Sequence, residues 1–303
     1  MSQSILETKG LSKKYGAFTA LKPLDLQLEK GCIYGLIGKN GAGKTTLLKM
    51  LAGQALPTSG EINLFGKKGK ALNSARKRMG AIVEHPAFFP DLTGRQNLEY
   101  YRIQRGIVEK NSVAVALRDM GLLDIADKKM KSYSLGNIQR LGIALALLGN
   151  PDLLILDEPI NGFDPMGVIE IRQLLLELNQ KRHITILLSS HNLFELEMLI
   201  TKVGFLDKGV LIEELSMKDL RKKCQSIIEV KVNHSEKAIA VLEGKLGISD
   251  VGVLPEHTIQ IQGKKELIPQ ISKILNENAI EIYSLREVAV SLEAYFIQLI
   301  GGN

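Results

Sequence analysis

The stretch Gly35–Leu51, GLIGKNGAGKTTLLKML, is the part of this chain around which the rest is organised. Residues 33–37 form an apolar run typical of a buried strand, and residues 46–51 place leucines on one side of a helix. Between them, four positions fit the pattern G-x-x-x-x-G-K-[ST]: Gly38, Gly43, Lys44 and Thr45. Strand, glycine-rich loop and helix in this order predict a loop that binds phosphate groups.

The chemistry of this loop points to a polyphosphate. Glycines let backbone N–H groups converge on an anion, and the helix N-terminus adds its positive dipole end. Lys44 would reach the β- and γ-phosphates, and the Thr45 hydroxyl would ligate Mg²⁺. The alternative is a glycine-rich surface turn with a solvated lysine. Four fixed positions match by accident on the order of once in a hundred such chains, so we favour the phosphate loop.

Composition limits the class of protein. A length of 303 residues with 45% apolar residues predicts two globular domains. No apolar run approaches the ~18 residues of a membrane span, and the first residues lack a signal-peptide segment, so we expect a cytosolic chain. Cys32 and Cys224 lack metal-ligand spacing and are expected to be reduced thiols. The net charge of +6 is mild, and the basic residues between positions 67 and 78 have no interleaved aromatics, which favours a solvated loop over nucleic-acid binding.

Two carboxylates follow a second buried strand. The apolar residues 153–156 run directly into Asp157 and Glu158, and parallel strands deliver such groups to the ligand edge of a sheet. Neighbouring carboxylates repel each other unless a bound cation or a proton neutralises part of their charge. Asp157 would hold Mg²⁺ through water, and Glu158 would act as general base on an attacking water. Exposed acids beyond a strand end are the alternative.

Other candidates lie near the same edge or on turns. His191 follows the strand 184–188, where an imidazole can bond a phosphate oxygen or the attacking water. Glu84 ends the strand 79–83, and a helix cap or a surface residue is its plainer interpretation. Tyr15, at a turn, could stack on a purine or be an ordinary surface tyrosine.

Helical and α+β regions complete the predicted architecture. Residues 92–148 are mostly helical, with starts at Thr93 and Asn111, and Ser134 is a plausible N-cap whose helix has free N–H groups for an anion. From residue 216 the order βαββαβ resembles a ferredoxin-like fold. We therefore predict an α/β protein with a P-loop NTPase core, an antiparallel β subdomain and a helical subdomain. The domains span residues 1–215, with the helical subdomain at about 85–150, and residues 216–303 as an α+β accessory domain.

Taken together, the first 215 residues or so closely resemble the ATP-binding subunit of ABC transporters. Gly38–Thr46 is similar to that family's Walker A motif, Leu153–Glu158 to its Walker B motif, and residues 134–138 stand where the signature belongs. The resemblance implies that ATP is bound by Tyr15, Gly38, Lys39, Asn40, Gly41, Ala42, Gly43, Lys44, Thr45 and Thr46. It implies catalysis by Lys44, Glu158 and His191, and Mg²⁺ binding by Thr45, Glu84 and Asp157. The signature Ser134, Leu135, Gly136 and Asn137 would contact the other subunit's ATP, and Asp164 would lie in the D-loop.

Three departures from the family pattern indicate a particular subfamily. Glu84 stands where most members have a glutamine, and Leu135 and Asn137 replace a glycine and a glutamine of the signature. These substitutions and the tail SLEAYFIQLIGG resemble the bacitracin and lantibiotic exporter subfamily. The resemblance implies an ATP-hydrolysing subunit, peripheral on the inner face of the membrane, that drives export of antimicrobial peptides. Its partners would be a membrane-spanning permease and a second copy of the chain.

Three alternatives remain open at the level of sequence. A soluble ABC ATPase acting on ribosomes or DNA usually carries two ATPase units or a coiled-coil insertion, and this chain has neither. An exporter of another substrate would share every motif named above. A binding module without ATPase chemistry is disfavoured because Lys44, Asp157, Glu158 and His191 are present together.

Overall fold

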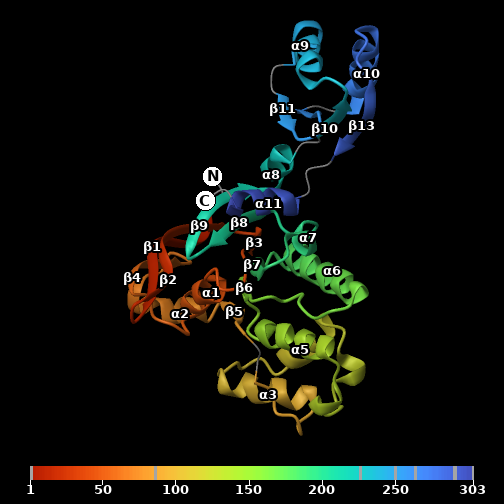
Figure 1. Ribbon diagram of the computed structural model, residues 1–303. Coiled ribbons are helices and arrows are strands. Elements are labelled where there is room, and N and C mark those ends of the chain that lie inside the picture. The colour runs from red at the N-terminus through yellow and green to blue at the C-terminus, as the bar shows by residue number, and fades with distance from the viewer. Residues whose placement is uncertain are drawn as a thin grey trace. The chain divides into compact units, whose positions relative to one another are not determined.

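The computed structural model describes residues 3–84, 87–224, 227–248, 251–262, 265–288 and 292–301. The chain divides into two compact units, Met1–Met217 and Lys218–Asn303 (Figure 1). Each unit has its own sheet and its own hydrophobic core.

A six-stranded sheet forms the centre of the first unit. Its strand order is β5-β6-β7-β3-β8-β9, in which β9 alone is antiparallel to its neighbour. The bounds are β3 Ile33–Ile37, β5 Met79–Ile82, β6 Leu153–Leu156, β7 Thr185–Ser190, β8 Lys202–Asp207 and β9 Val210–Ser216. Every residue of β3, β6 and β7 is buried, as expected for parallel strands covered on both faces.

A three-stranded antiparallel sheet lies beside it, in the order β2-β1-β4. These strands are β1 Ser4–Tyr15, β2 Phe18–Glu29 and β4 Ser59–Leu64. One hydrophobic core joins this sheet to helix α1, Lys44–Ala52, through buried leucines such as Leu26, Leu47 and Leu51. The hairpin turn falls at residues 16 and 17, so Tyr15, predicted within the turn, is instead the last residue of β1.

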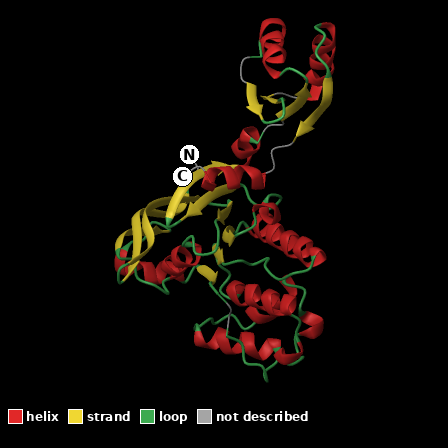
Figure 2. Ribbon diagram, in the orientation of Figure 1, coloured by secondary structure: helices red, strands yellow, loops and turns green. Residues whose placement is uncertain are grey.

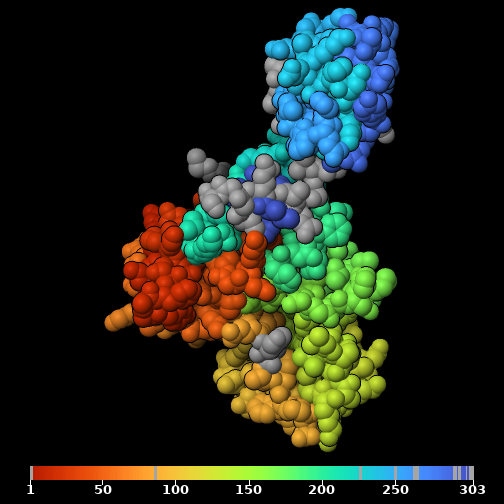
Figure 3. All heavy atoms as spheres, viewed as in Figure 1, coloured from red at the N-terminus to blue at the C-terminus, as the bar shows by residue number. Residues whose placement is uncertain are grey.

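Helices α3, α4 and α5 pack on one another in a helical region, and α5 also packs on strand β5 of the central sheet (Figure 2). They span Gly94–Gln104, Ser112–Asp119 and Leu135–Leu147. Thr93 caps α3 in a capping box with Gln96, and Asn111 and Ser134 are the N-cap residues of α4 and α5, which confirms the predicted helix starts. On the face in Figure 3, this region occupies a different part of the first unit from β1 and β2. Residues 85 and 86, at the start of the predicted helical subdomain, lie outside the described residues.

The remaining helices of the first unit flank these elements. They are α2 Leu72–Arg76, α6 Pro165–Arg182 and α7 Leu193–Leu196, and α8 Met217–Lys223 begins at the end of this unit. Cys32 packs against the core, and burial raises the pKa of its thiol to about 11. The thiol is therefore protonated at neutral pH.

The second unit is a four-stranded antiparallel sheet with two helices packed on it. The strand order is β11-β12-β10-β13, and the chain order is β10, α9, β11, β12, α10, β13. Buried residues of β10 and β12, such as Val230 and Ile259, form one core with Leu242 of α9 and Leu275 of α10. The bounds are β10 Ile227–Val232, α9 Ser235–Leu246, β11 Val251–Leu254, β12 Thr258–Gln262, α10 Ile268–Glu277, β13 Ile282–Val288 and α11 Leu292–Gly301. Residues 291 and 302 of the tail lie outside the described part of the chain.

Among the described residues, no helix combines the length and the apolar character required to cross a membrane.

Asn97 is a buried polar residue that fixes the start of the helical region. Its side-chain oxygen accepts from Phe89 N–H at 2.8 Å, and its Nδ2 donates to the carbonyls of Phe89 and Thr93 at 3.1 and 2.9 Å. The two carbonyls also accept from the backbone N–H groups of Leu92 and Asn97, so the side chain adds to these bonds and is the partner of the Phe89 N–H.

We expect Asn97→Ala to lower the free energy of unfolding by about 2–4 kcal/mol, because it removes three hydrogen bonds of a buried amide and leaves the Phe89 N–H without its partner. Thr93→Ala, which removes only a cap, should cost about 1 kcal/mol. Exposed Gln104→Ala on the same helix should change it by less than about 0.5 kcal/mol. Urea unfolding of the three variants measures this ranking, and an Asn97→Ala cost no larger than that of Gln104→Ala would contradict it.

Candidate functional site

Three parallel strands end at one edge of the central sheet and carry the candidate residues. The phosphate loop follows β3, Asp157 and Glu158 follow β6, and His191 follows β7 (Figure 1). Because β3 pairs with β7 and β7 with β6, segments distant in the sequence become neighbours. The edge therefore unites the motifs that the sequence singled out separately.

The phosphate loop needs glycine at both ends. A Cβ on Gly38 would lie 2.4 Å from the carbonyl oxygen of Leu206, so no larger residue fits where the loop leaves β3. Gly43, the N-cap of α1, has φ of 108°, in the left-handed region that favours glycine. Gly38 N–H donates to the Ser190 carbonyl at 3.2 Å, which joins the loop to the end of β7.

Lys44 is held inside the loop rather than in solvent. Only 6% of the residue is exposed. Its Nζ donates to the carbonyls of Gly38 at 2.6 Å and Lys39 at 3.3 Å, and lies 3.4 Å from Glu158 Oε1. A buried ammonium at this place supplies a positive charge to any phosphate that the loop binds.

Asp157 is fixed by two hydroxyl groups. Thr45 Oγ1 donates to its Oδ2 at 2.8 Å, and Ser189 Oγ donates to its Oδ1 at 2.5 Å. Thr45 and Asp157 therefore place a hydroxyl and a carboxylate, both hard oxygen ligands, side by side. Ser189 was not among the residues singled out from the sequence.

Glu158 lies between a lysine and a histidine. Its Oε1 faces Lys44, and its Oε2 is 2.9 Å from His191 Nδ1. The residue has φ of 48°, an uncommon conformation outside glycine. With about a quarter of its side chain exposed, this carboxylate is placed to accept a proton from a water molecule.

A cavity of 290 Å³ lies over the loop. It is lined by Phe18, Ala20, residues 39–46 and Glu158. Phe18 was not singled out from the sequence, whereas Tyr15, which was, does not line this cavity. Tyr15 pairs with Phe18 across the hairpin, and both rings are exposed, at 49% and 66%. The sequence signal for Phe18 was a second aromatic residue three positions after Tyr15.

Glu84 has an unexpected partner. Its Oε1 lies 2.7 Å from Lys49 Nζ of α1, whereas Thr45 is bonded to Asp157. It also lines a 520 Å³ cavity together with Asp157, Glu158 and residues of α5. Glu84 thus lines the same cavity as the carboxylate pair, while its own carboxylate forms an ion pair with Lys49.

The signature residues lie at the N-terminus of α5. Ser134 Oγ accepts from Asn137 N–H at 3.3 Å, and Leu135 is 53% exposed. A Cβ on Gly136 would lie 3.0 Å from the Phe163 ring, and Asp164 caps α6 by accepting from Gly167 N–H at 2.7 Å. Neither Ser134 nor Gly136 lines the cavity over the phosphate loop. Leu135, in contrast, lines the 520 Å³ cavity together with Asp157 and Glu158.

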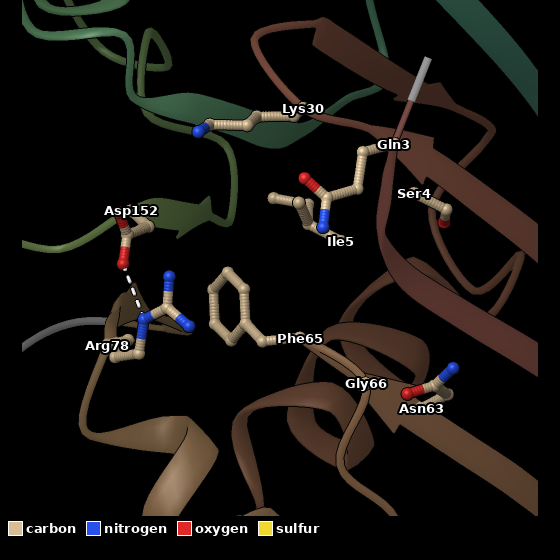
Figure 4. A pocket seen from close by; sticks show the side chains of 9 residues that line it. All are labelled: Gln3, Ser4, Ile5, Lys30, Asn63, Phe65, Gly66, Arg78 and Asp152. Atoms are coloured by element: carbon tan, nitrogen blue, oxygen red, sulfur yellow. Dashed lines mark hydrogen bonds and ion pairs between the residues drawn. The ribbon is translucent and has the colours of Figure 1, made fainter. Parts of the chain in front are cut away.

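Two further observations limit the alternatives. Another cavity lies at the opposite edge of the sheet, where Arg78 precedes β5 and Asp152 precedes β6 (Figure 4). These two residues form an ion pair at 2.7 Å beside Phe65. The phosphate loop does not line this cavity. Among the described residues, no group of three or more His, Cys, Asp or Glu side chains could hold a metal ion.

Comparisons with known proteins agree with this geometry. Residues 21–161 match the family model described as ABC transporter. The chain is 40% identical over 301 residues to the bacitracin transport ATP-binding protein BcrA of Bacillus licheniformis, covering 99% of this chain and 98% of the relative. It is 38% identical over 210 residues to the lantibiotic transport ATP-binding protein SrtF of Streptococcus pyogenes, covering 69% and 90%. A solved dimeric ATP-binding cassette in a post-hydrolysis state, bound to ADP and Pi, has a TM-score of 0.63 at 25% identity, covering 70% of this chain and 98% of that chain.

Gly38→Ala should weaken binding of a nucleoside triphosphate at least tenfold, about 1.4 kcal/mol, because the added methyl group collides with backbone and displaces the loop. Gly41→Ala is the comparison in the same loop: its Cβ would meet open space, although φ is 81°. It should cost less, because only the left-handed conformation is penalised. Titration with a fluorescent ATP analogue measures both, and equal losses would show that the contact with Leu206 is unimportant.

Proposed function

The chain belongs to the ATP-binding proteins of ABC transporters, and we propose that it drives export of antimicrobial peptides of the bacitracin and lantibiotic type. It is an ATP-binding and ATP-hydrolysing subunit, and its first unit has the α/β fold of ABC ATPases. The substrate proposal is supported by relatives named for bacitracin and lantibiotic transport. Resistance or immunity to such peptides would be the consequence.

The site supports the following division of roles. The loop from Gly38 to Thr46 binds the phosphates of ATP, and Lys44 offsets their charge. Tyr15 stacks on the adenine, with Phe18 beside it in the hairpin. Glu158 takes the proton of the attacking water, and His191 orients its carboxylate.

The donor set at Thr45 and Asp157 fits Mg²⁺. The hydroxyl and the carboxylate are hard oxygen ligands held 2.8 Å apart, and Glu84 is a further carboxylate near them. Mg²⁺ bound there would offset the charge that develops on the β- and γ-phosphates. Glu84 would contribute after its ion pair with Lys49 opens. That pair is partly exposed and contributes only about 0–1 kcal/mol.

The complete site is proposed to need two copies of the chain. In each copy the capped N-terminus of α5 has N–H groups available to an anion, and it does not reach the copy's own phosphate loop. The signature residues Ser134, Leu135, Gly136 and Asn137 of one copy would therefore contact the γ-phosphate bound by the other. Asp164 would lie in the same contact through the D-loop, next to Phe163, which packs on Gly136.

A membrane-spanning permease is the proposed partner, with the chain on the cytoplasmic face of the membrane. A cluster of aromatic rings follows Glu84 in the helical region: Phe88 packs on Tyr101, and Phe89 packs on Tyr100. Phe89 and Tyr100 are exposed, and exposed apolar clusters are typical of protein contacts. This cluster is our candidate for the permease contact.

The second unit is proposed to be a ferredoxin-like accessory domain, corresponding to residues 216–303, with the ATPase domain at 1–215. Its element order βαββαβ and its strand order β11-β12-β10-β13 support this assignment.

Glu158→Gln should keep ATP binding but lower kcat about 10²- to 10⁴-fold, because the amide cannot accept the water proton. The variant should form an ATP-dependent dimer, detected by size-exclusion chromatography. Lys44→Ala is the control, which should lose binding and dimer together. Full hydrolysis by Glu158→Gln would disprove its role as the base.

The substrate is tested in cells that carry the natural permease. Loss of this chain, or its replacement by Glu158→Gln, should lower the inhibitory concentration of bacitracin or of a lantibiotic severalfold. An unchanged response to both classes would contradict the substrate while leaving the ATPase assignment intact.

A further inference from the structure

Ser189 occupies the position in the central sheet where the carboxylate pair and the phosphate loop meet. In the parallel pairing of β6 with β7, Leu156 lies opposite Leu188, so the next residues along the two strands are Asp157 and Ser189. On the other side of β7, Ser189 lies opposite Leu36 of β3, two residues before the loop begins. Its side chain is completely buried.

The single hydroxyl of Ser189 joins two neighbouring residues. Oγ donates to Asp157 Oδ1 at 2.5 Å and accepts from the backbone N–H of Glu158 at 3.0 Å. A hydroxyl can serve as donor and acceptor at once. Both of these hydrogen bonds therefore go to the two residues that carry the carboxylates.

These bonds fix groups that would otherwise have freedom to move. Glu158 has φ of 48°, a conformation that a residue with a side chain keeps only when its surroundings enforce it. The bond from its N–H to Ser189 is such a constraint, and in that conformation its carboxylate reaches Lys44 and His191. Thr45 alone would hold one oxygen of the Asp157 carboxylate and leave the carboxylate group free to rotate. The hydrogen bond from Ser189 fixes the other oxygen.

We infer that Ser189 is a positioning residue for ATP hydrolysis, which sets the Asp157 carboxylate and the Glu158 backbone relative to each other. The inference rests on the roles proposed above for Asp157 and Glu158. Ser189 acts through these residues and does not itself touch the nucleotide. Its loss should therefore reduce turnover and raise the Mg²⁺ requirement, while ATP affinity, which depends on the loop and Lys44, is kept.

Ser189→Thr and Ser189→Val form a matched pair, because the two side chains have the same shape and differ in the hydroxyl group. In the full chain, Ser189→Val should lower kcat about tenfold or more, leave KM for ATP nearly unchanged and raise the half-saturating Mg²⁺ concentration. Ser189→Thr should recover most of the rate. Equal rates for the two variants would overturn the inference. Ser189→Ala, which adds no bulk, gives the same comparison if valine impairs folding.

Two controls separate the causes. Thr185, at the other end of β7, is also completely buried, and its Oγ1 accepts from Gly31 N–H at 2.8 Å. Thr185→Val should lower the unfolding temperature without changing the Mg²⁺ requirement. If it changes this requirement as Ser189→Val does, the inference fails. Glu158→Gln is assayed in parallel. Full hydrolysis by that variant refutes the proposed base, whereas an inactive Glu158→Gln with a normal Ser189→Val refutes only the role of Ser189.

Discussion

The hydrogen bond from Thr45 to Asp157 is the contact on which the ligand edge depends. It joins the first turn of α1 to the end of β6, residues that are 112 positions apart in the chain. The pairing of β3 with β7 and of β7 with β6 brings these two ends within reach. Because all three strands are fully buried, packing in the core sets their register. The register in turn fixes the positions of the polar groups that follow the strands.

The same edge explains how charge is tolerated at the site. Lys44 is buried, yet its ammonium group is satisfied by two carbonyls and by Glu158. Asp157 has a hydroxyl donor on each oxygen, so its charge is also met by hydrogen bonds. Buried charges are costly unless they are paired in this way. The charged groups at this edge of the sheet are therefore held by partners within the chain.

Glu84 and the signature illustrate two different limits on reasoning from motifs. The family resemblance implied that Glu84 would be a metal ligand, and the structure pairs it with Lys49, a contact weak enough to open. The signature residues were expected at another copy's ATP, and within one chain they stay apart from the cavity over the loop. In the first case a competing partner was invisible in the sequence, and in the second the geometry supports the need for a second copy.

The sequence by itself determined those features whose signals are local. Thr93 and Ser134 mark helix starts because their side chains accept from backbone N–H groups three residues later, and Asn111 stands at the third helix start without such a bond. The glycine-rich loop and the acidic strand end are likewise recognised within a few positions. Tertiary structure alone decided that Phe18 lines the cavity, that Lys49 engages Glu84 and that Ser189 bridges Asp157 and Glu158. These contacts depend on which strands are neighbours and in what register, and that is set by packing between segments far apart in the chain.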